Sequence, residues 1–198
     1  MSHQLPTTEE AIQRHLLWRP EFEHDSCGVG FVANISGKRS TQPLRMAINS
    51  VCNLMHRGAV DADAKTGDGA GVLTQIPHKL FAKEVTKLGH KLFNENDLAV
   101  GFFFLPRENA YHLAQCKAIV EDVIKKRGLF LFGWRRVPID KSVLGDKAFA
   151  TLPEIEQALI GRQASQNDET YERTLFLTRK EIERRVADAN IPNFYVPS

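Results

Sequence analysis

The sequence predicts a layered fold of mixed helices and strands, of the α/β or α+β class. Apolar runs of strand length at Leu98–Leu105 and Leu129–Val137 enclose a long segment of helical character, Arg107–Arg127. Gly128 and Pro138 follow the helix and the second strand, at positions where these residues commonly end such elements. Alternation of the two kinds of element is the observation on which the fold class depends.

The segments before residue 98 are shorter and richer in glycine. In order, we expect a helix over Ala11–Trp18, a strand over Cys27–Ile35, an amphipathic helix over Thr41–His56, a strand over Val72–Ile76 and a helix over Pro77–Leu88. Gly28 and Gly30 weaken the first of these strands. Glycines in such places usually mark the close approach of a ligand or of another backbone.

The C-terminal third gives weaker signals. Possible strands at Leu175–Thr178 and Phe194–Val196 flank a charged helix, Arg179–Ala189, and Gln163–Glu169 has the composition of a polar loop. The sequence stops at Ser198, immediately after the second possible strand and without a polar tail. We therefore expect an interrupted fold.

Composition and charge limit the classes of partner and the cellular compartment that we expect for this chain. The 198 residues are enough for one domain, and the 26 basic and 24 acidic residues give a net charge of only +2. Because these charges are interspersed, we expect binding neither to nucleic acid nor to a membrane surface. Three widely spaced cysteines are not a disulfide framework, and the N-terminus lacks the pattern of a signal peptide, so we expect a cytoplasmic protein.

Cys27 is the candidate nucleophile, but its spacing alone is not diagnostic. A thiol reacts as the thiolate and needs a base, and from spacing a small buried side chain is the commoner interpretation. A metal site is a third possibility, since His24-x-x-Cys27 and Cys52-x-x-x-His56 offer two sulfurs and two imidazoles. Zinc spacing is more regular, and Cys52 falls among the expected core positions of its helix, so we expect no metal.

Several motifs decide between these interpretations. They are Glu23-His24-Asp25-Ser26-Cys27-Gly28, His56-Arg57-Gly58-Ala59, Thr66-Gly67-Asp68-Gly69-Ala70-Gly71, Gly133-Trp134-Arg135, Ser142-Val143-Leu144-Gly145 and Tyr171-Glu172-Arg173. In this order they resemble the glutaminase domain, a class II glutamine amidotransferase, of glutamate synthase large subunits. The resemblance covers nearly the whole chain from Glu21 onward. The loop at 66–71 lacks the lysine and the following helix of a phosphate-binding loop.

The resemblance implies an α+β fold with the four αββα layers of Ntn hydrolases. Residues 1–26 are then a propeptide-like segment, and residues 27–198 are part of a type 2 amidotransferase domain. Cys27 is the implied nucleophile, and its freed α-amine, with a pKa near ~8, is the implied base. Gly28, Arg57, Gly58 and Asp68 are implied to support the site. Two structural alternatives stay open: Arg57 as a cap of the preceding helix, and Asp68 as a turn residue.

The resemblance also implies a reaction, namely hydrolysis of glutamine to glutamate and ammonia, with the ammonia used for reductive amination of 2-oxoglutarate. Implied partners are glutamine, the remainder of the large subunit and a small subunit; FMN and an iron–sulfur cluster are implied for the full-length subunit, and no cofactor for this chain. The Asn-Gly pair that supplies oxyanion donors in this family is missing from the sequence. We therefore expect roughly the first half of the domain, inactive by itself; the alternative is a catalytically silent fragment or interaction module.

Overall fold

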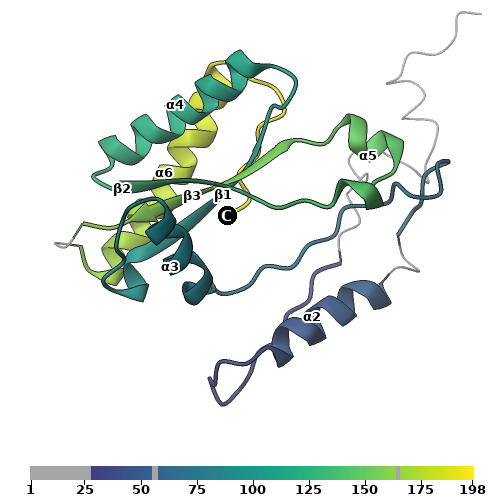
Figure 1. Cartoon of the computed structure of the whole chain (residues 1–198), viewed down its shortest axis with the longest axis horizontal. Coiled ribbons are helices and arrows are strands. Elements are labelled where there is room, and N and C mark those ends of the chain that lie inside the picture. The colour runs from purple at the N-terminus through teal and green to yellow at the C-terminus, as the bar shows by residue number, and fades with distance from the viewer. Residues whose placement is uncertain (1–27, 55–57, 164–165) are drawn as a thin grey trace, which may run out of the picture. The chain divides into compact units, whose positions relative to one another are not determined.

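The computed structural model describes residues 28–54, 58–163 and 166–198. Its elements are α2 (Gln42–Asn53), α3 (His78–Lys87), the 3-10 turn η3 (Glu95–Asp97), β1 (Leu98–Leu105), α4 (Ala110–Lys126), β2 (Phe130–Arg136), the 3-10 turn η4 (Lys141–Val143), α5 (Asp146–Ala150), β3 (Glu154–Gly161) and α6 (Asp168–Asp188) (Figure 1). The chain divides into two units between Ser50 and Val51. Within the described ranges, no helix combines the length and apolar character that crossing a bilayer requires.

One antiparallel sheet forms the centre of the unit that begins at Val51. Its strand order is β1-β3-β2, so β3 pairs on both sides. β1 is matched to β3 along its full length, from Leu98 opposite Gly161 to Leu105 opposite Glu154. The other edge of β1 receives the C-terminal segment: Phe104 and Tyr195 exchange two backbone hydrogen bonds of 2.8 and 3.0 Å.

A β-bulge in β2 distributes its side chains between the two faces of the sheet. The register with β3 shifts between Leu131 and Gly133, and Gly133 has a φ of +148°, which favours glycine. As a result Leu131 and Trp134 both pack against the larger core cluster, whereas Phe132 packs against the smaller one. The bulge thus allows one short strand to contribute side chains to both core clusters.

The two clusters lie on opposite faces of the sheet, because side chains alternate along its strands. The larger combines side chains of β1 and β3 with those of α4 and α6; its buried members include Phe103, Leu105, Val120, Ile160 and Ile182. The smaller holds α3 against the sheet through Phe81, Val85, Leu98 and Leu159. The larger cluster holds most of the buried apolar side chains and therefore most of the hydrophobic stabilisation.

Asparagine caps fix where the two long helices begin. The side chain of Asn109 accepts hydrogen bonds from the backbone N–H groups of Tyr111 and His112 at the start of α4. The Asn167 side chain accepts one from Thr170 N at the start of α6. Gly128, with a φ of +69°, follows the end of α4 and confirms the expected C-terminal glycine.

The α+β class is confirmed, and the layers present are one antiparallel sheet with its helices, as in part of an Ntn-hydrolase domain. Four local predictions are wrong. Residues 28–35 and 72–76 form no strand, Leu175–Thr178 lies inside α6, and Cys52 is exposed because α2 buries none of its residues. A strand needs a paired neighbour, and among the described residues neither of the first two segments has one. The helix expected over 11–18 lies outside the described residues.

Phe103 provides a test of the larger core. It is 2% exposed and packs edge-on to Trp134 with 5.3 Å between ring centroids. We expect Phe103→Ala to lower the free energy of unfolding by about 3–5 kcal/mol, measured by urea denaturation. The matched control is Phe93→Ala, at a ring that is 85% exposed, which should change it by no more than about 0.5 kcal/mol. Equal losses in the two variants would contradict this core.

Candidate functional site

The structure describes three of the five predicted site residues. Cys27 and Arg57 lie outside the described residues. Gly28 is exposed in the unit that ends at Ser50, whereas Gly58 and Asp68 belong to the unit that begins at Val51. The structure therefore gives the setting of Gly58 and Asp68 and does not relate them to Gly28.

Asp68 closes the base of a small hairpin, residues 59–68, which we call the site hairpin. Its Oδ2 accepts a hydrogen bond of 2.9 Å from the backbone N–H of Ala59, the residue after Gly58. Val60 and Gly67 form an antiparallel bridge above it, and Asp61 N donates to Thr66 O at 2.7 Å. Asp68 thus joins the two ends of this loop. This is more than the local turn that the sequence left open as an alternative.

Asp63 closes the tip of the site hairpin. Its Oδ1 accepts hydrogen bonds from the backbone N–H groups of Lys65 (2.9 Å) and Thr66 (2.7 Å), and its Oδ2 accepts one from Thr66 Oγ1 (2.5 Å). The Thr66 hydroxyl and then its N–H stabilise the charged form and lower the pKa of Asp63 to about 2. Ala64, at the turn itself, has a φ of +57°. The tip is therefore a tight turn organised around one carboxylate.

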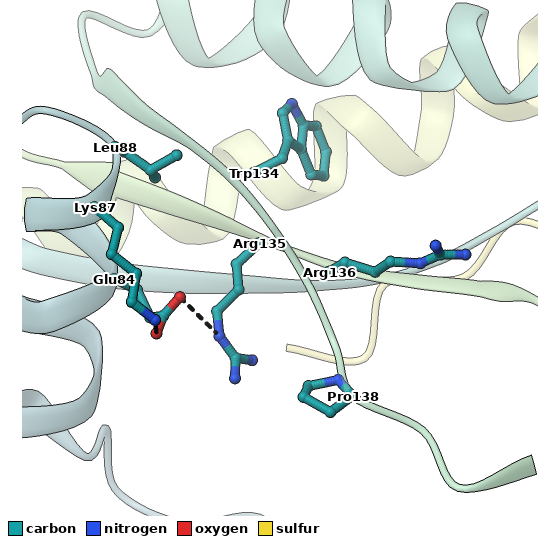
Figure 2. Close-up of a pocket in the computed structure, with 7 residues that line it drawn as sticks. All are labelled: Glu84, Lys87, Leu88, Trp134, Arg135, Arg136 and Pro138. Carbon is teal, nitrogen blue, oxygen red and sulfur yellow. Dashed lines mark hydrogen bonds and ion pairs between the residues drawn. The ribbon is translucent and has the colours of Figure 1, made fainter.

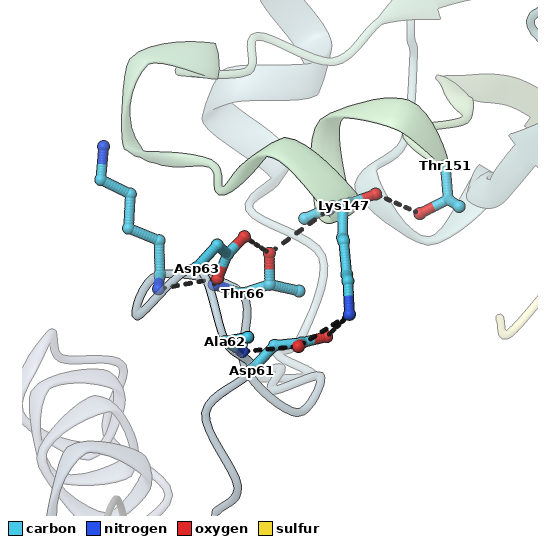
Figure 3. A network of polar contacts seen from close by, with 8 residues as sticks. Asp61, Ala62, Asp63, Thr66, Lys147 and Thr151 are labelled. Atoms are coloured by element: carbon cyan, nitrogen blue, oxygen red, sulfur yellow. Dashed lines mark hydrogen bonds and ion pairs between the residues drawn. The ribbon is translucent and has the colours of Figure 1, made fainter.

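The tip contacts α5 (Figure 3) and also lies against Gly145, the residue before that helix. Lys147 Nζ lies 2.6 and 2.7 Å from the two carboxylate oxygens of Asp61, and Ala148 N donates to Thr66 Oγ1 at 3.4 Å. A Cβ atom on Gly145 would lie 2.3 Å from Asp63 Oδ2 and 2.3 Å from Thr66 Oγ1. Because no Cβ can approach so closely, this contact requires glycine at position 145.

This contact was not predicted from the sequence. Gly145 and Thr66 belong to two separate motifs of the resemblance, about 80 residues apart, and no sequence pattern assigned a role to Asp61, Asp63 or Lys147. The available signal was the order Asp63-Ala64-Lys65-Thr66, since an aspartate that precedes a threonine by three residues is well placed to close a turn. Nothing in one sequence indicated which distant segment this turn would contact.

A shallow surface pocket between α3 and β2 is a structural feature rather than a reactive one (Figure 2). Its lining contains Glu84, Lys87, Trp134 and Arg135, but no cysteine, serine or histidine. The charges are satisfied locally. Glu84 pairs with Lys87 at 2.7 Å and with Arg135 at 3.6 Å, and Arg135 also donates to the Gln157 side chain at 2.8 Å. The Gly-Trp-Arg motif therefore contributes to packing and ion pairing of the sheet.

The two described cysteines differ in environment. Cys116 is buried among the α4 residues of the larger core, and burial raises the pKa of its thiol to about 11. Cys52 is exposed on α2. Within the part of the chain that the structure describes, no group of three or more His, Cys, Asp or Glu side chains could hold a metal ion. His24, Cys27 and His56, which belong to the metal alternative, lie outside that part.

Comparison with known proteins gives the family. The profile of the class-II glutamine amidotransferases matches residues 27–198, which is most of the chain. This chain belongs to the class-II glutamine amidotransferases. The predicted resemblance is therefore confirmed at the level of the family.

Relatives of this chain include several glutamate synthases. It is 44% identical over 181 residues to the NADPH glutamate synthase large chain of Azospirillum brasilense, covering 91% of this chain and 12% of that protein. It is 37% identical over 166 residues to the ferredoxin-dependent glutamate synthase of Pyropia yezoensis (84% and 10%), and 34% identical over 168 residues to the NADPH large chain of Bacillus subtilis (84% and 11%). The chain thus spans about a tenth of the length of these relatives.

The lowered pKa of Asp63 gives the site hairpin a definite pH dependence. Its folded value of about 2 lies below the ~3.9 of an unperturbed aspartate, so the carboxylate contributes its full stabilisation above about pH 4. That contribution is lost as the pH falls through about 2. We expect the carboxyl carbon of Asp63 to titrate near pH 2 by NMR. In the same transition the Thr66 amide hydrogen should lose its protection, measured as its exchange rate relative to the intrinsic rate at each pH. Asp63→Asn should abolish this transition, and a midpoint near 4 would contradict the hydrogen bonding described here.

Proposed function

We propose that this chain is the glutaminase part of a glutamate synthase, with Cys27 as the nucleophile. The observation that carries this proposal is that the family match begins at Cys27 itself. A domain whose first residue is its nucleophile is what an Ntn mechanism requires, because the free α-amine then serves as the base. Residues 1–26 are, in this proposal, a propeptide whose removal creates that amine.

The proposed reaction proceeds through a thioester. The α-amine of Cys27 takes the thiol proton, and the thiolate attacks the side-chain amide carbon of glutamine. The tetrahedral intermediate collapses with cleavage of the C–N bond, and the protonated amine gives its proton to the departing ammonia. Water, deprotonated by the same amine, then attacks the thioester carbonyl. The C–S bond breaks, glutamate is released and the thiolate regains its proton.

The site hairpin supports this proposal because it holds Ala59, two residues after Arg57 in the sequence, against the carboxylate of Asp68. In the proposal, Arg57 lies beside the nucleophile and orders it, and Gly58 and Asp68 fix the chain that follows. Donors for the oxyanion have to come from outside this sequence, which contains no Asn-Gly pair. Loss of one such donor costs roughly 100- to 1000-fold in rate. We therefore propose that the rest of a synthase large subunit completes the site.

The iron–sulfur cluster of the proposed synthase does not fit the cysteines that the structure describes. An iron–sulfur cluster is held by several cysteine thiolates, whereas Cys116 is buried in a helical core and Cys52 stands alone on α2. We propose that FMN and the cluster bind in the remainder of the large subunit. There the ammonia is used for reductive amination of 2-oxoglutarate. A small subunit as electron-transfer partner belongs to the same proposal.

A second candidate function is that of a silent interaction module. It is favoured by large apolar side chains that stand exposed in both units. Those in residues 28–50 are Val29, Phe31, Ile35, Leu44, Met46 and Ile48, and those in residues 51–73 are Leu54, Val60, Val72 and Leu73. Exposed apolar side chains in such number indicate surfaces that another segment or chain covers. Glutamine hydrolysis distinguishes the two functions.

Replacement of the nucleophile tests the proposed function. In the whole protein as expressed from its gene, we expect Cys27→Ala to abolish glutamine hydrolysis, while any ammonia-dependent synthesis of glutamate survives. A diazoketone analogue of glutamine should alkylate Cys27 far faster than Cys52, and Cys116 should stay unlabelled because it is buried and protonated. Cys52→Ala is the control and should leave hydrolysis within about twofold. Equal labelling of Cys27 and Cys52 in the native protein would contradict the proposal.

A further inference from the structure

We infer that Asp63 and Gly145 are positioning residues for glutamine hydrolysis, because their contact fixes the site hairpin, which ends at Asp68 and directly follows Gly58. This inference rests on the proposed function and adds two residues to it. Each acts through the hairpin, whose base adjoins Arg57 in the chain.

The α5 side of the contact is fixed by the sheet. Gly145 and α5 lie on the connection between β2 and β3, and that connection is tied at its root by the hydrogen bond from Val137 N to Ile155 O (3.0 Å). Arg107, between β1 and α4, holds the far end. Its guanidinium donates to Phe149 O at 3.1 Å and lies over the Phe149 ring. α5 is therefore a support attached to the sheet framework at two places.

The hairpin side has little packing of its own. Val60 is 66% exposed, and neither core cluster includes a residue of 59–68. Segments with few buried apolar contacts open at low free-energy cost. The hairpin must therefore be held largely by its polar contacts with α5, which are the Asp61–Lys147 pair, the hydrogen bond from Ala148 N to Thr66 and the close fit of Asp63 and Thr66 over Gly145.

Displacement of the tip reaches the base through three successive cross-links. Asp61 N bonds Thr66 O, Val60 bridges Gly67, and Ala59 N bonds the Asp68 carboxylate. A shift at Asp63 therefore moves Gly58 and Asp68, and with them the chain that leads to Arg57. Displacement of a positioning group by about 1 Å can cost about 100-fold in rate.

Gly145→Ala tests the close contact at this position without straining the backbone. The backbone at Gly145 has φ −75° and ψ 163°, which alanine adopts without strain. The added methyl group therefore acts only through its clash with Asp63 and Thr66. Asp63→Ala removes the carboxylate from the other side of the same contact. Because both variants act on one contact, their effects in the double variant should be much less than additive.

Asp140→Ala is the matched control. Asp140 has the same turn chemistry as Asp63, with its Oδ1 accepting from Ser142 N (3.0 Å) and Ser142 Oγ (2.6 Å). It lies five residues before Gly145. Its carboxylate bonds Ser142 rather than the site hairpin, so the substitution removes a similar turn without changing the contact.

The test compares two rates of alkylation of Cys27 in the whole protein, followed by mass spectrometry. The diazoketone analogue of glutamine reports an ordered site, and iodoacetamide reports only thiol reactivity and access. We expect Asp63→Ala and Gly145→Ala to lower the diazoketone rate by about 10- to 100-fold and the iodoacetamide rate by no more than about twofold. Amide exchange should accelerate at Asp61 and Thr66 but not in β3. Asp140→Ala should change none of these quantities.

Three results would count against the inference in distinguishable ways. An unchanged ratio of the two rates in Gly145→Ala, in a protein whose unsubstituted form is labelled selectively at Cys27, would overturn this inference alone. Parallel loss of both rates, with faster exchange in β3, would show a general structural role and overturn it as well. Absence of selective labelling in the unsubstituted protein would overturn the proposed function, and this inference with it.

Discussion

β3 pairs with both neighbouring strands, and the unit that begins at Val51 is built around this pairing. β3 is the last strand in the chain and the central one in the sheet, and Gln157 to Gly161 are buried. Until β3 is in place, β1 and β2 have no partner in the sheet, and the helices have no complete surface to cover. The larger core cluster, from Phe103 to Val196, forms around this arrangement.

The same pairing explains how the site hairpin is placed. β2 and β3 run antiparallel, so the segment between them leaves the sheet and returns to it at the same end. That segment carries Gly145 and α5. The site hairpin, which has almost no core of its own, is thus fixed against α5, whose position the sheet determines. Their contact at Gly145 leaves no room for a Cβ atom. Residues far apart in the sequence act together in this way, because the hairpin has little packing of its own and α5 is attached to the sheet framework.

The sequence predicted those helices and strands whose boundary residues and apolar spacing agree with their place in the tertiary structure. Pro77 before α3, the apolar run of β1 and Gly128 after α4 all lie where the structure has those boundaries. β3 was missed because Glu154, Gln157, Ala158 and Leu159 are good helix formers, and tertiary pairing overrides such preferences. A strand was expected at Leu175–Thr178 because this apolar run is too short for its spacing to distinguish a strand from a helix. The cap at Asn167, followed by two acidic residues, was the better signal for α6.

The site was predicted less completely than the family. Motif order indicated Cys27, Arg57, Gly58 and Asp68, and the family match confirms the class to which such residues belong. The contact between Asp63 and Gly145 could not be predicted, because it depends on the return of β3 to the sheet rather than on any local pattern. Composition likewise could not show that Cys52 is exposed, since an amphipathic helix is buried only where a partner surface covers it.

Cys27 is proposed to act as an N-terminal nucleophile, and the mass of the active species is the sharpest test of that role. Purified species are separated by chromatography, each is identified by its intact mass, and glutamine hydrolysis is measured for each. The α-amine of Cys27 is an amide nitrogen while Ser26 is attached, so we predict that all active material begins at Cys27 and that the species retaining residues 1–26 is inactive. Glutamine hydrolysis by a species that begins at Met1 would contradict this role of Cys27.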